Sequence, residues 1–225
     1  GLDEKKRKLR RAISLSLNIE QYVQILHNGR GKIAHGPLPS GIFGHVKGRD
    51  GINPLVYRWD EPTQTAQPHP IETARQLMTE AGYPDGIGAD KKQLVLHYDV
   101  RSGRTAKMKL DWMNRQLERI GVRVELRETD ANRWQTKLDD GNFQFINYGW
   151  YADYPDPENF LFLLYGPNNR VDTHGENYAN YENDEYDRLF EQMATMADSP
   201  KRKTIIQEMV KIARIDAPWL FAWEP

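Results

Sequence analysis

The alternation of strand and helix patterns in the middle of the chain constrains its fold more than any other feature. Segments with strand character at 93–98, 122–126 and 143–150 are separated by helical patterns at 105–120 and 131–138. Successive strands separated by a helix-length crossover pair in parallel, with the helices packed on the sheet. The order therefore predicts an α/β layer with crossover helices.

Apolar residues at helical spacing predict further helices on both sides of this layer. Those helices cover 4–17, 19–26, 71–81, 156–165, 183–196 and 199–215, and a last apolar strand covers 218–223. The helices at 156 and 199 begin with a capping residue followed by proline, which suits the first helical position. Residues 166–181 are predicted to form a polar loop rich in Asn and Gly.

Residues 31–70 differ from the rest of the chain because Gly and Pro interrupt every regular pattern. Ile42, Phe43, Tyr57 and Trp59 make this segment too apolar for disorder. A long irregular segment inside a compact domain is unusual unless it lies against another surface. We therefore expect a wrapping segment, within a single α/β domain that includes residues 1–225.

Composition and charge exclude several classes of function. The 225 residues carry 31 Lys and Arg against 32 Asp and Glu, so no overall field attracts nucleic acid or an anionic membrane. The basic run at 5–11 is compatible with a nucleic-acid arm, but a solvated helix face is the favoured interpretation. No apolar stretch reaches the about 18 residues of a membrane span, and residues 1–17 are too charged for a signal peptide. We expect no nucleic-acid partner, no membrane insertion and an export signal outside these residues.

No motif for catalysis or for metal or cofactor binding is present. Cysteine is absent, which excludes disulfides and thiolate chemistry, and the six histidines lack the spacing of a shared metal site. Neither a Gly-rich phosphate loop nor a nucleophile elbow occurs. We therefore predict no catalytic residue, no metal and no cofactor.

Three acidic residues, Asp153, Asp156 and Glu158, follow the strand predicted at 143–150. A carboxylate pair can hydrolyse a glycoside, so a hydrolase is one alternative. Local structure accounts for two of the three, because Asp156 suits an N-cap and Glu158 suits a first helical turn. Asp153 has no such explanation, although a turn aspartate that bonds its own backbone is an alternative.

Aromatic residues surround Asp153 in the sequence. Trp150, Tyr151 and Tyr154 lie just beyond the end of a strand, where α/β proteins place their ligand sites. A carboxylate walled by aromatic rings attracts a cation through charge-assisted hydrogen bonds and cation–π contact. These four residues are therefore predicted to bind a ligand, and a primary ammonium group fits the site.

Four stretches, in order, resemble the family 5 extracellular solute-binding proteins, the oligopeptide and dipeptide receptors of ABC importers. They are LRRAISLSLN at 9–18, HGPLPSG at 35–41, ARQLMTEAGYPDG at 74–86 and GWYADYPDP at 149–157. The last two are specific, and the resemblance covers essentially the whole chain. Asn18 stands where some members have Asp, which changes only a helix-end cap.

The resemblance implies the C-terminal lobe of a two-lobed protein of the periplasmic-binding-protein type II class, an α/β lobe with a mixed sheet flanked by helices. The N-terminal lobe would be absent from these residues. It implies a peptide ligand held between the lobes and the permease subunits of an ABC importer as partners. Asp153 would pair with the N-terminal ammonium of the peptide, and the backbone of Trp150 and Tyr151 would run beside the ligand. Residues 31–70 would lie at the lobe junction, and the protein would be periplasmic or a cell-surface lipoprotein.

Two alternatives to a peptide receptor stay open beside the hydrolase. Members of the family also carry nickel complexes, haem, opines or sugars, and the presence of Asp153 is what favours a peptide. An interaction scaffold without a small ligand would lack a concave site around Trp150 and Asp153.

Overall fold

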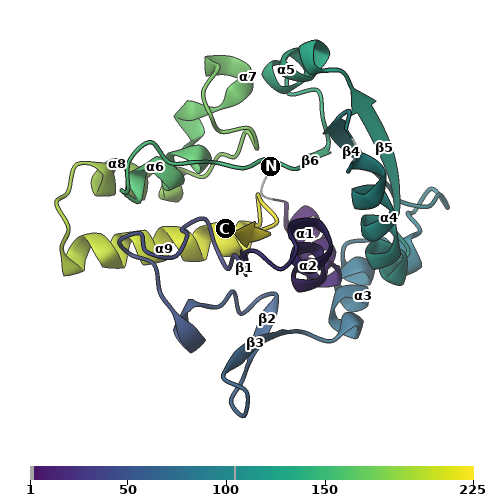
Figure 1. Ribbon diagram of the computed structural model, residues 1–225, viewed down its shortest axis with the longest axis horizontal. Helices are drawn as coiled ribbons and strands as arrows, with labels where there is room; N and C mark the ends of the chain where they lie inside the picture. Colours follow the sequence, from purple (N-terminus) through teal and green to yellow (C-terminus); the bar gives the residue numbers. More distant parts are fainter. Residues whose placement is uncertain (1–2, 104) are drawn as a thin grey trace.

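The computed structural model describes residues 3–103 and 105–225, and it contains a three-stranded parallel sheet, at the right in Figure 1. In the middle of the sheet, β4 (Val95–Arg101) pairs along its whole length with β5 (Arg123–Thr129). On its other side β4 pairs with β6 (Phe145–Ile146). The crossovers contain α4 (Ala106–Leu117) and α5 (Ala131–Asp139), so the predicted α/β fold is confirmed. The sheet is parallel throughout and not mixed as expected, because its strands are joined only by these helical crossovers.

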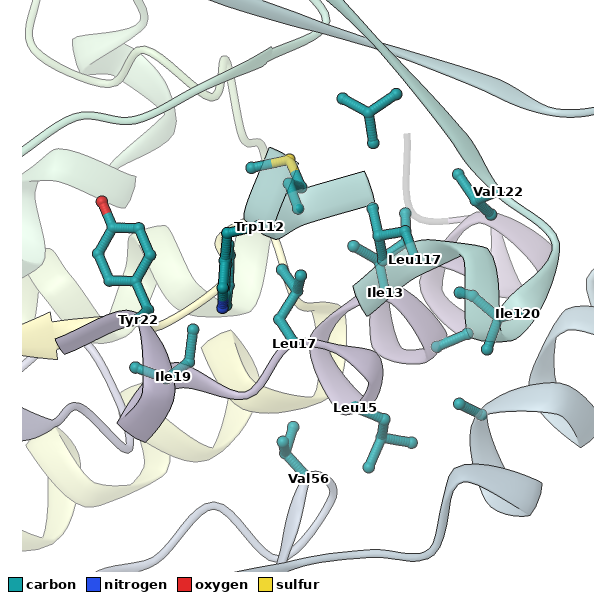
Figure 2. Packing of buried hydrophobic residues seen from close by; sticks show 14 of the residues in the cluster. Ile13, Leu15, Leu17, Ile19, Tyr22, Val56, Trp112, Leu117, Ile120 and Val122 are labelled. Atoms are coloured by element: carbon teal, nitrogen blue, oxygen red, sulfur yellow. The ribbon is translucent and has the colours of Figure 1, made fainter. Parts of the chain in front are cut away.

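The first apolar core lies between this sheet and the N-terminal helices. It is formed by α1 (Glu4–Ser16), α2 (Ile19–His27), α3 (Ile71–Glu80), α4 and the sheet. The Trp112 ring of α4 is almost fully buried and stands edge-on to Tyr22 of α2, with ring centroids 5.0 Å apart. Figure 2 shows Trp112 between Tyr22 and Leu17, where it joins the short α2 to the sheet layer.

A second apolar core lies on the other side of the molecule, at the left in Figure 1. It is formed by α6 (Glu158–Leu161), α8 (Asp184–Ala194) and α9 (Pro200–Asp216), with Tyr186, Met193, Ile206 and Met209 fully buried. Asn183 and Ser199 cap α8 and α9 through their side chains, at the starts that the sequence predicts. Strong caps and an apolar stripe made these two helices easy to predict.

A buried carboxylate joins α1 of the first core to α8 and α9 of the second. Asp216, at the end of α9, is 3% exposed and accepts hydrogen bonds from Arg7 (3.2 Å), Tyr181 (2.6 Å) and Asn183 (2.9 Å). Arg10 donates to the backbone carbonyls of Asp216 and Ala217. Two members of the basic run therefore hold the two cores together.

The segment 31–70 is more regular than expected. It contains β1 (Lys32–Ile33), which pairs with β7 (Trp223–Glu224), and a hairpin of β2 (Tyr57–Asp60) and β3 (Thr65–Pro68). The hairpin was missed because prolines bracket β3, and proline argues against a strand except at a sheet edge. Both pairs are antiparallel and separate from the parallel sheet.

Several other boundaries differ from the prediction. The last strand, expected at 218–223, is only the two-residue β7. The strand expected at 143–150 pairs only at Phe145 and Ile146, because the chain then leaves the sheet. The loop at 166–181 contains a short helix, α7 (Arg170–Thr173). Figure 1 shows α7 facing α5 across the top of the molecule.

Candidate functional site

The residues predicted to bind a ligand lie on a segment that runs from the sheet to the second core. We call residues 147–157 the crossing segment, because it leads from β6 to α6 without helix or strand (Figure 1). The middle of the crossing segment is open to solvent, with 87% of Tyr151 and 46% of Tyr154 exposed. Its path outside the sheet is what brings its side chains to the surface.

Trp150 anchors the crossing segment to α6. The indole Nε1 donates to Oδ1 of Asn159 at 3.0 Å, and the ring stands edge-on to Phe162 with centroids 5.3 Å apart. Trp150 is half-buried, so one part of the ring packs inward while another part faces solvent. The prediction that Trp150 forms part of a ligand-binding wall is compatible with this position and stays a prediction.

Asn159 organises this region and was missed in the sequence. Its side chain is 4% exposed, and the same Oδ1 atom that bonds Trp150 also accepts the backbone N–H of Asp153 at 3.2 Å. One buried amide thus fixes both the indole and the backbone that carries the carboxylate. The only signal in the sequence was an Asn inside a predicted helix, where Asn is disfavoured without a specific partner.

The Asp153 carboxylate itself has no partner in the described part of the chain, residues 3–103 and 105–225. Its side chain is exposed, accepts no hydrogen bond there and forms no ion pair. The alternative of a turn aspartate that bonds its own backbone therefore does not describe this residue. The backbone N–H of Asp153 is bonded, but both of its carboxylate oxygens are free to accept hydrogen bonds. Such a carboxylate can bind an ammonium group.

Asp156, in contrast, is part of the framework. Its two carboxylate oxygens accept from the Arg202 guanidinium of α9 at 2.7 and 2.9 Å, and Oδ1 also accepts the Glu158 backbone N–H. Burial raises the pKa of Asp156, but the hydrogen bonds from Arg202 and from the Glu158 backbone N–H, together with the charge of Arg202, hold the pKa below its ordinary value. Asp156 lies just before α6, but the cap residue of that helix is Pro157 and not Asp156 as expected, because the helix begins one residue later, at Glu158. The buried Arg202 is a partner that the sequence did not reveal.

Glu158 is also engaged, because the Tyr154 hydroxyl donates to its carboxylate. This contact turns the Tyr154 ring toward α6. Of the three clustered acids, one is bound by Arg202, one by Tyr154, and Asp153 stands alone. The cluster therefore does not present two free carboxylates to a common substrate, which a two-carboxylate hydrolase needs.

A second aromatic contact borders the crossing segment near β6. The rings of Tyr148 and Tyr178 have centroids 4.5 Å apart, and the Arg170 guanidinium lies 5.0 Å from the Tyr178 centroid. Burial, followed by a hydrogen bond with Tyr148, raises the pKa of Tyr178 well above its ordinary value. Neither tyrosine was singled out in the sequence, because their contact depends on the path of the loop at 166–181.

Two further observations bear on the expected classes of function. Across residues 3–103 and 105–225, His, Asp and Glu side chains do not gather in threes in a way that would hold a metal ion. Over the same residues, the helices are either too short or too polar to cross a bilayer.

Comparison with known proteins gives one family. A family model described as "Bacterial extracellular solute-binding proteins, family 5 Middle" matches residues 4–172. A heme-binding protein A from Haemophilus influenzae is 24% identical over 95% of this chain and 35% of its own length. The oligopeptide-binding protein OppA of Bacillus subtilis is 26% identical over 89% of this chain and 34% of its own length. The chain thus spans about a third of the length of the curated relatives it matches.

Solved structures show the same fold. A periplasmic binding protein DppA from Helicobacter pylori, in complex with the peptide STSA, superposes with a TM-score of 0.76 at 21% identity. The match covers 99% of this chain and 39% of that protein. The oligopeptide-binding protein AppA from Bacillus subtilis, in complex with a nonapeptide, also gives 0.76 at 21% identity and covers 97% of this chain and 42% of that protein.

Proposed function

Because this chain belongs to the bacterial extracellular solute-binding proteins of family 5, we propose that it supplies the C-terminal ligand-binding lobe of a two-lobed peptide receptor. The receptor captures a peptide between its lobes outside the cytoplasm and delivers it to the permease of an ABC importer. The partial coverage of the relatives supports a second lobe beyond these residues. Peptides are favoured as ligands by relatives and neighbours whose names include an oligopeptide-binding protein and peptide complexes.

One observation carries the assignment of the ligand class, the unpartnered carboxylate of Asp153. Its backbone is fixed by Asn159, and its neighbours Asp156 and Glu158 are already bound. A fixed carboxylate beside exposed aromatic rings suits the charged amino terminus of a peptide. In this proposal Asp153 binds the ammonium, and Trp150, Tyr151 and Tyr154 line the wall of the cleft.

The proposed mechanism is closure of the two lobes around the ligand. A peptide that contacts both lobes favours the closed form, which the importer then recognises. Residues 31–70 and the β1–β7 pair would lie at the junction of the lobes. Chemistry on the peptide plays no part, since binding and release suffice.

The test is binding of matched peptides to the full-length protein by calorimetry. We expect Asp153→Asn to weaken binding of trialanine by about 10- to 100-fold, because a charge-assisted hydrogen bond contributes about 1.5–3 kcal/mol. Binding of N-acetyl-trialanine, which has no ammonium, should be weak in the wild type and change less than about 3-fold in the variant. The control is Asp111→Asn, an exposed aspartate on α4.

Two results would contradict the proposal. Equal weakening for the free and the acetylated peptide would remove the ammonium role from Asp153. Haem, a nickel complex or a sugar found by mass spectrometry in the purified full-length protein, in place of peptides, would overturn the ligand class.

A further inference from the structure

An arginine in the short helix α7, Arg170, connects that helix to α5. Arg170, the first residue of α7, donates through Nη2 to the Asp139 carboxylate at the end of α5. Only 12% of the Arg170 side chain is exposed, and its Nη1 donates to the carbonyls of His174 and Gly175 at 3.0 and 3.2 Å. The hydrogen bond to Asp139 raises the pKa of Arg170, so the charge is always present.

The two elements that Arg170 connects are also in direct contact. Gly141 follows α5 with a φ of +62°, and a Cβ added there would lie 2.7 Å from Val171 Cγ2 of α7. The ion pair therefore sits at a junction where backbone and side chain touch. Its position is fixed by packing as well as by charge.

The same guanidinium also holds an aromatic ring. Its Cζ atom lies 5.0 Å from the centroid of Tyr178, a distance at which a cation is attracted to the face of a ring. Tyr178 in turn contacts Tyr148, with 4.5 Å between centroids and 42° between ring planes. Tyr148 belongs to the crossing segment and precedes Trp150 by two residues.

We infer that Asp139, Arg170, Tyr178 and Tyr148 form a relay that sets the position of the crossing segment, so that Arg170 is a positioning residue for ligand binding. The inference rests on the proposed peptide-binding function. Arg170 acts through Tyr178 and Tyr148, while Asn159 and Arg202 fix the crossing segment from its other end. The ligand-facing residues between them are then held from both sides of the molecule.

Arginine is the residue type that this relay needs. Its planar guanidinium can bond a carboxylate and backbone carbonyls at its edge while its face or edge contacts a ring. A lysine ammonium keeps the charge but cannot make these contacts together. The ring of Tyr178 carries the contact to Arg170, whereas its hydroxyl bonds Tyr148, so phenylalanine should keep the first contact and weaken the second.

The first experiment does not depend on any ligand. With ring-labelled tyrosine, the 4.5 Å contact should give strong NMR cross-peaks between the rings of Tyr148 and Tyr178 in the wild type. We expect Arg170→Gln to abolish these cross-peaks and Arg133→Gln, an exposed arginine on α5, to preserve them. Cross-peaks that persist at full strength in Arg170→Gln would overturn the relay.

The second experiment measures trialanine affinity in the full-length protein. Arg170→Gln and Tyr178→Leu should each weaken binding by about 10-fold, Arg170→Lys and Tyr178→Phe by an intermediate factor, and Arg133→Gln by less than about 2-fold. Because the residues act in series, the double variant Arg170→Gln/Tyr178→Leu should bind no more weakly than either single variant. Additive losses, or wild-type affinity in Arg170→Gln, would refute the role of Arg170.

The outcomes separate this inference from the proposed function. A wild-type protein that binds no peptide refutes the peptide receptor and the role of Arg170 in binding, whereas the NMR cross-peaks still decide whether the relay exists. If Arg170→Gln does not fold, Arg170→Lys supplies the NMR test, and Tyr178→Leu, which leaves the ion pair in place, supplies the affinity test.

Discussion

At the scale of single residues, two aspartates three positions apart have opposite environments. Asp156 is bound by Arg202, whereas the Asp153 carboxylate lacks a partner among residues 3–103 and 105–225. The difference arises from the backbone, because the chain bends at Tyr154 and Pro155 and directs Asp156, but not Asp153, toward Arg202. The stretch 149–157 thus contains Asp156, which stabilises the fold, and Asp153, which is available to a ligand.

Removing Arg202 should destabilise the protein more than removing an exposed arginine. The Arg202 side chain is 4% exposed and bonds both oxygens of Asp156, so Arg202→Gln leaves a carboxylate without its cation. We expect a loss of about 2–4 kcal/mol in the free energy of unfolding in urea. Arg188→Gln, which breaks the exposed pair with Glu185, should cost less than about 1 kcal/mol. Equal losses in the two variants would contradict a framework role for Arg202.

His35 should make stability depend on pH on the acid side. Burial, and then the charge of Arg214, lowers the pKa of His35 to about 4, below the about 6.5 of an unfolded histidine. The unfolded chain therefore takes up the proton first, so this contribution is complete above about pH 6.5 and is lost as the pH falls toward 4. The loss is up to about 3 kcal/mol, at about 1.4 kcal/mol per pH unit.

The measurement is the slope of the unfolding free energy between about pH 4.5 and 6.5. His35→Gln should flatten this slope, whereas His174→Asn, at an exposed position with a φ of +55°, should leave it unchanged. An unchanged slope in His35→Gln would assign the acid sensitivity to other groups.

At the scale of elements, helices with caps and stripes could be predicted and short strands could not. The starts of α8 and α9 follow from Asn183 and from Ser199-Pro200, whose effect is local. The hairpin of β2 and β3 and the two-residue β6 depend on pairing partners that no local pattern specifies. The parallel sheet could be predicted because the alternation of strand and helix patterns along the sequence shows that helices connect its strands.

The candidate site divides in the same way. The position of Asp153 after a strand could be predicted, because ligand sites of α/β proteins lie at strand ends. The contacts of Asn159, Arg202 and Tyr178 could not, since their partners are brought together by the path of the crossing segment and of the loop at 166–181.

Gly121 and Gly86 form the contact between the turn after α4 and the turn after α3. Gly121 has a φ of +74°, and a Cβ added there would lie 2.0 Å from the carbonyl oxygen of Asp85. Gly121→Ala should therefore lower the unfolding free energy by about 3 kcal/mol or more, through left-handed strain and overlap. Gly82 is the control, because its φ is +92° but nothing lies within 4 Å of the added Cβ. Gly82→Ala should cost only about 1–2 kcal/mol, the strain alone.

At the scale of the whole molecule, the two apolar cores meet at Asp216. Its carboxylate gathers donors from α1, from the loop before α8 and from the first residue before that helix. This single buried charge makes the cores depend on each other. Cooperative unfolding of both cores is the expected consequence.

Asp216→Ala should uncouple the cores. Hydrogen exchange can be followed in α4, which belongs to the first core, and in α8, which belongs to the second. The two helices should show the same free energy of opening in the wild type and different ones in the variant. The total loss is expected to be about 3–5 kcal/mol, because Arg7 and Tyr181 lose a buried partner. Glu208→Ala, on the exposed face of α9, should keep the common opening. Equal protection of both helices in Asp216→Ala would show that the coupling lies elsewhere.

In the crossing segment, Trp150 and Asp156 make contacts with the rest of the protein, whereas the residues just after Trp150 are exposed. Trp150 and Asp156 carry the packing, while Tyr151 and Ala152 contribute almost nothing to it. Mutations at those open positions alter the chemistry of the exposed surface without a penalty in folding. Descendants of this chain can therefore acquire new preferences by drift at a few positions while their scaffold stays the same, and a combinatorial library at 151 and 152 would explore that variation in the laboratory.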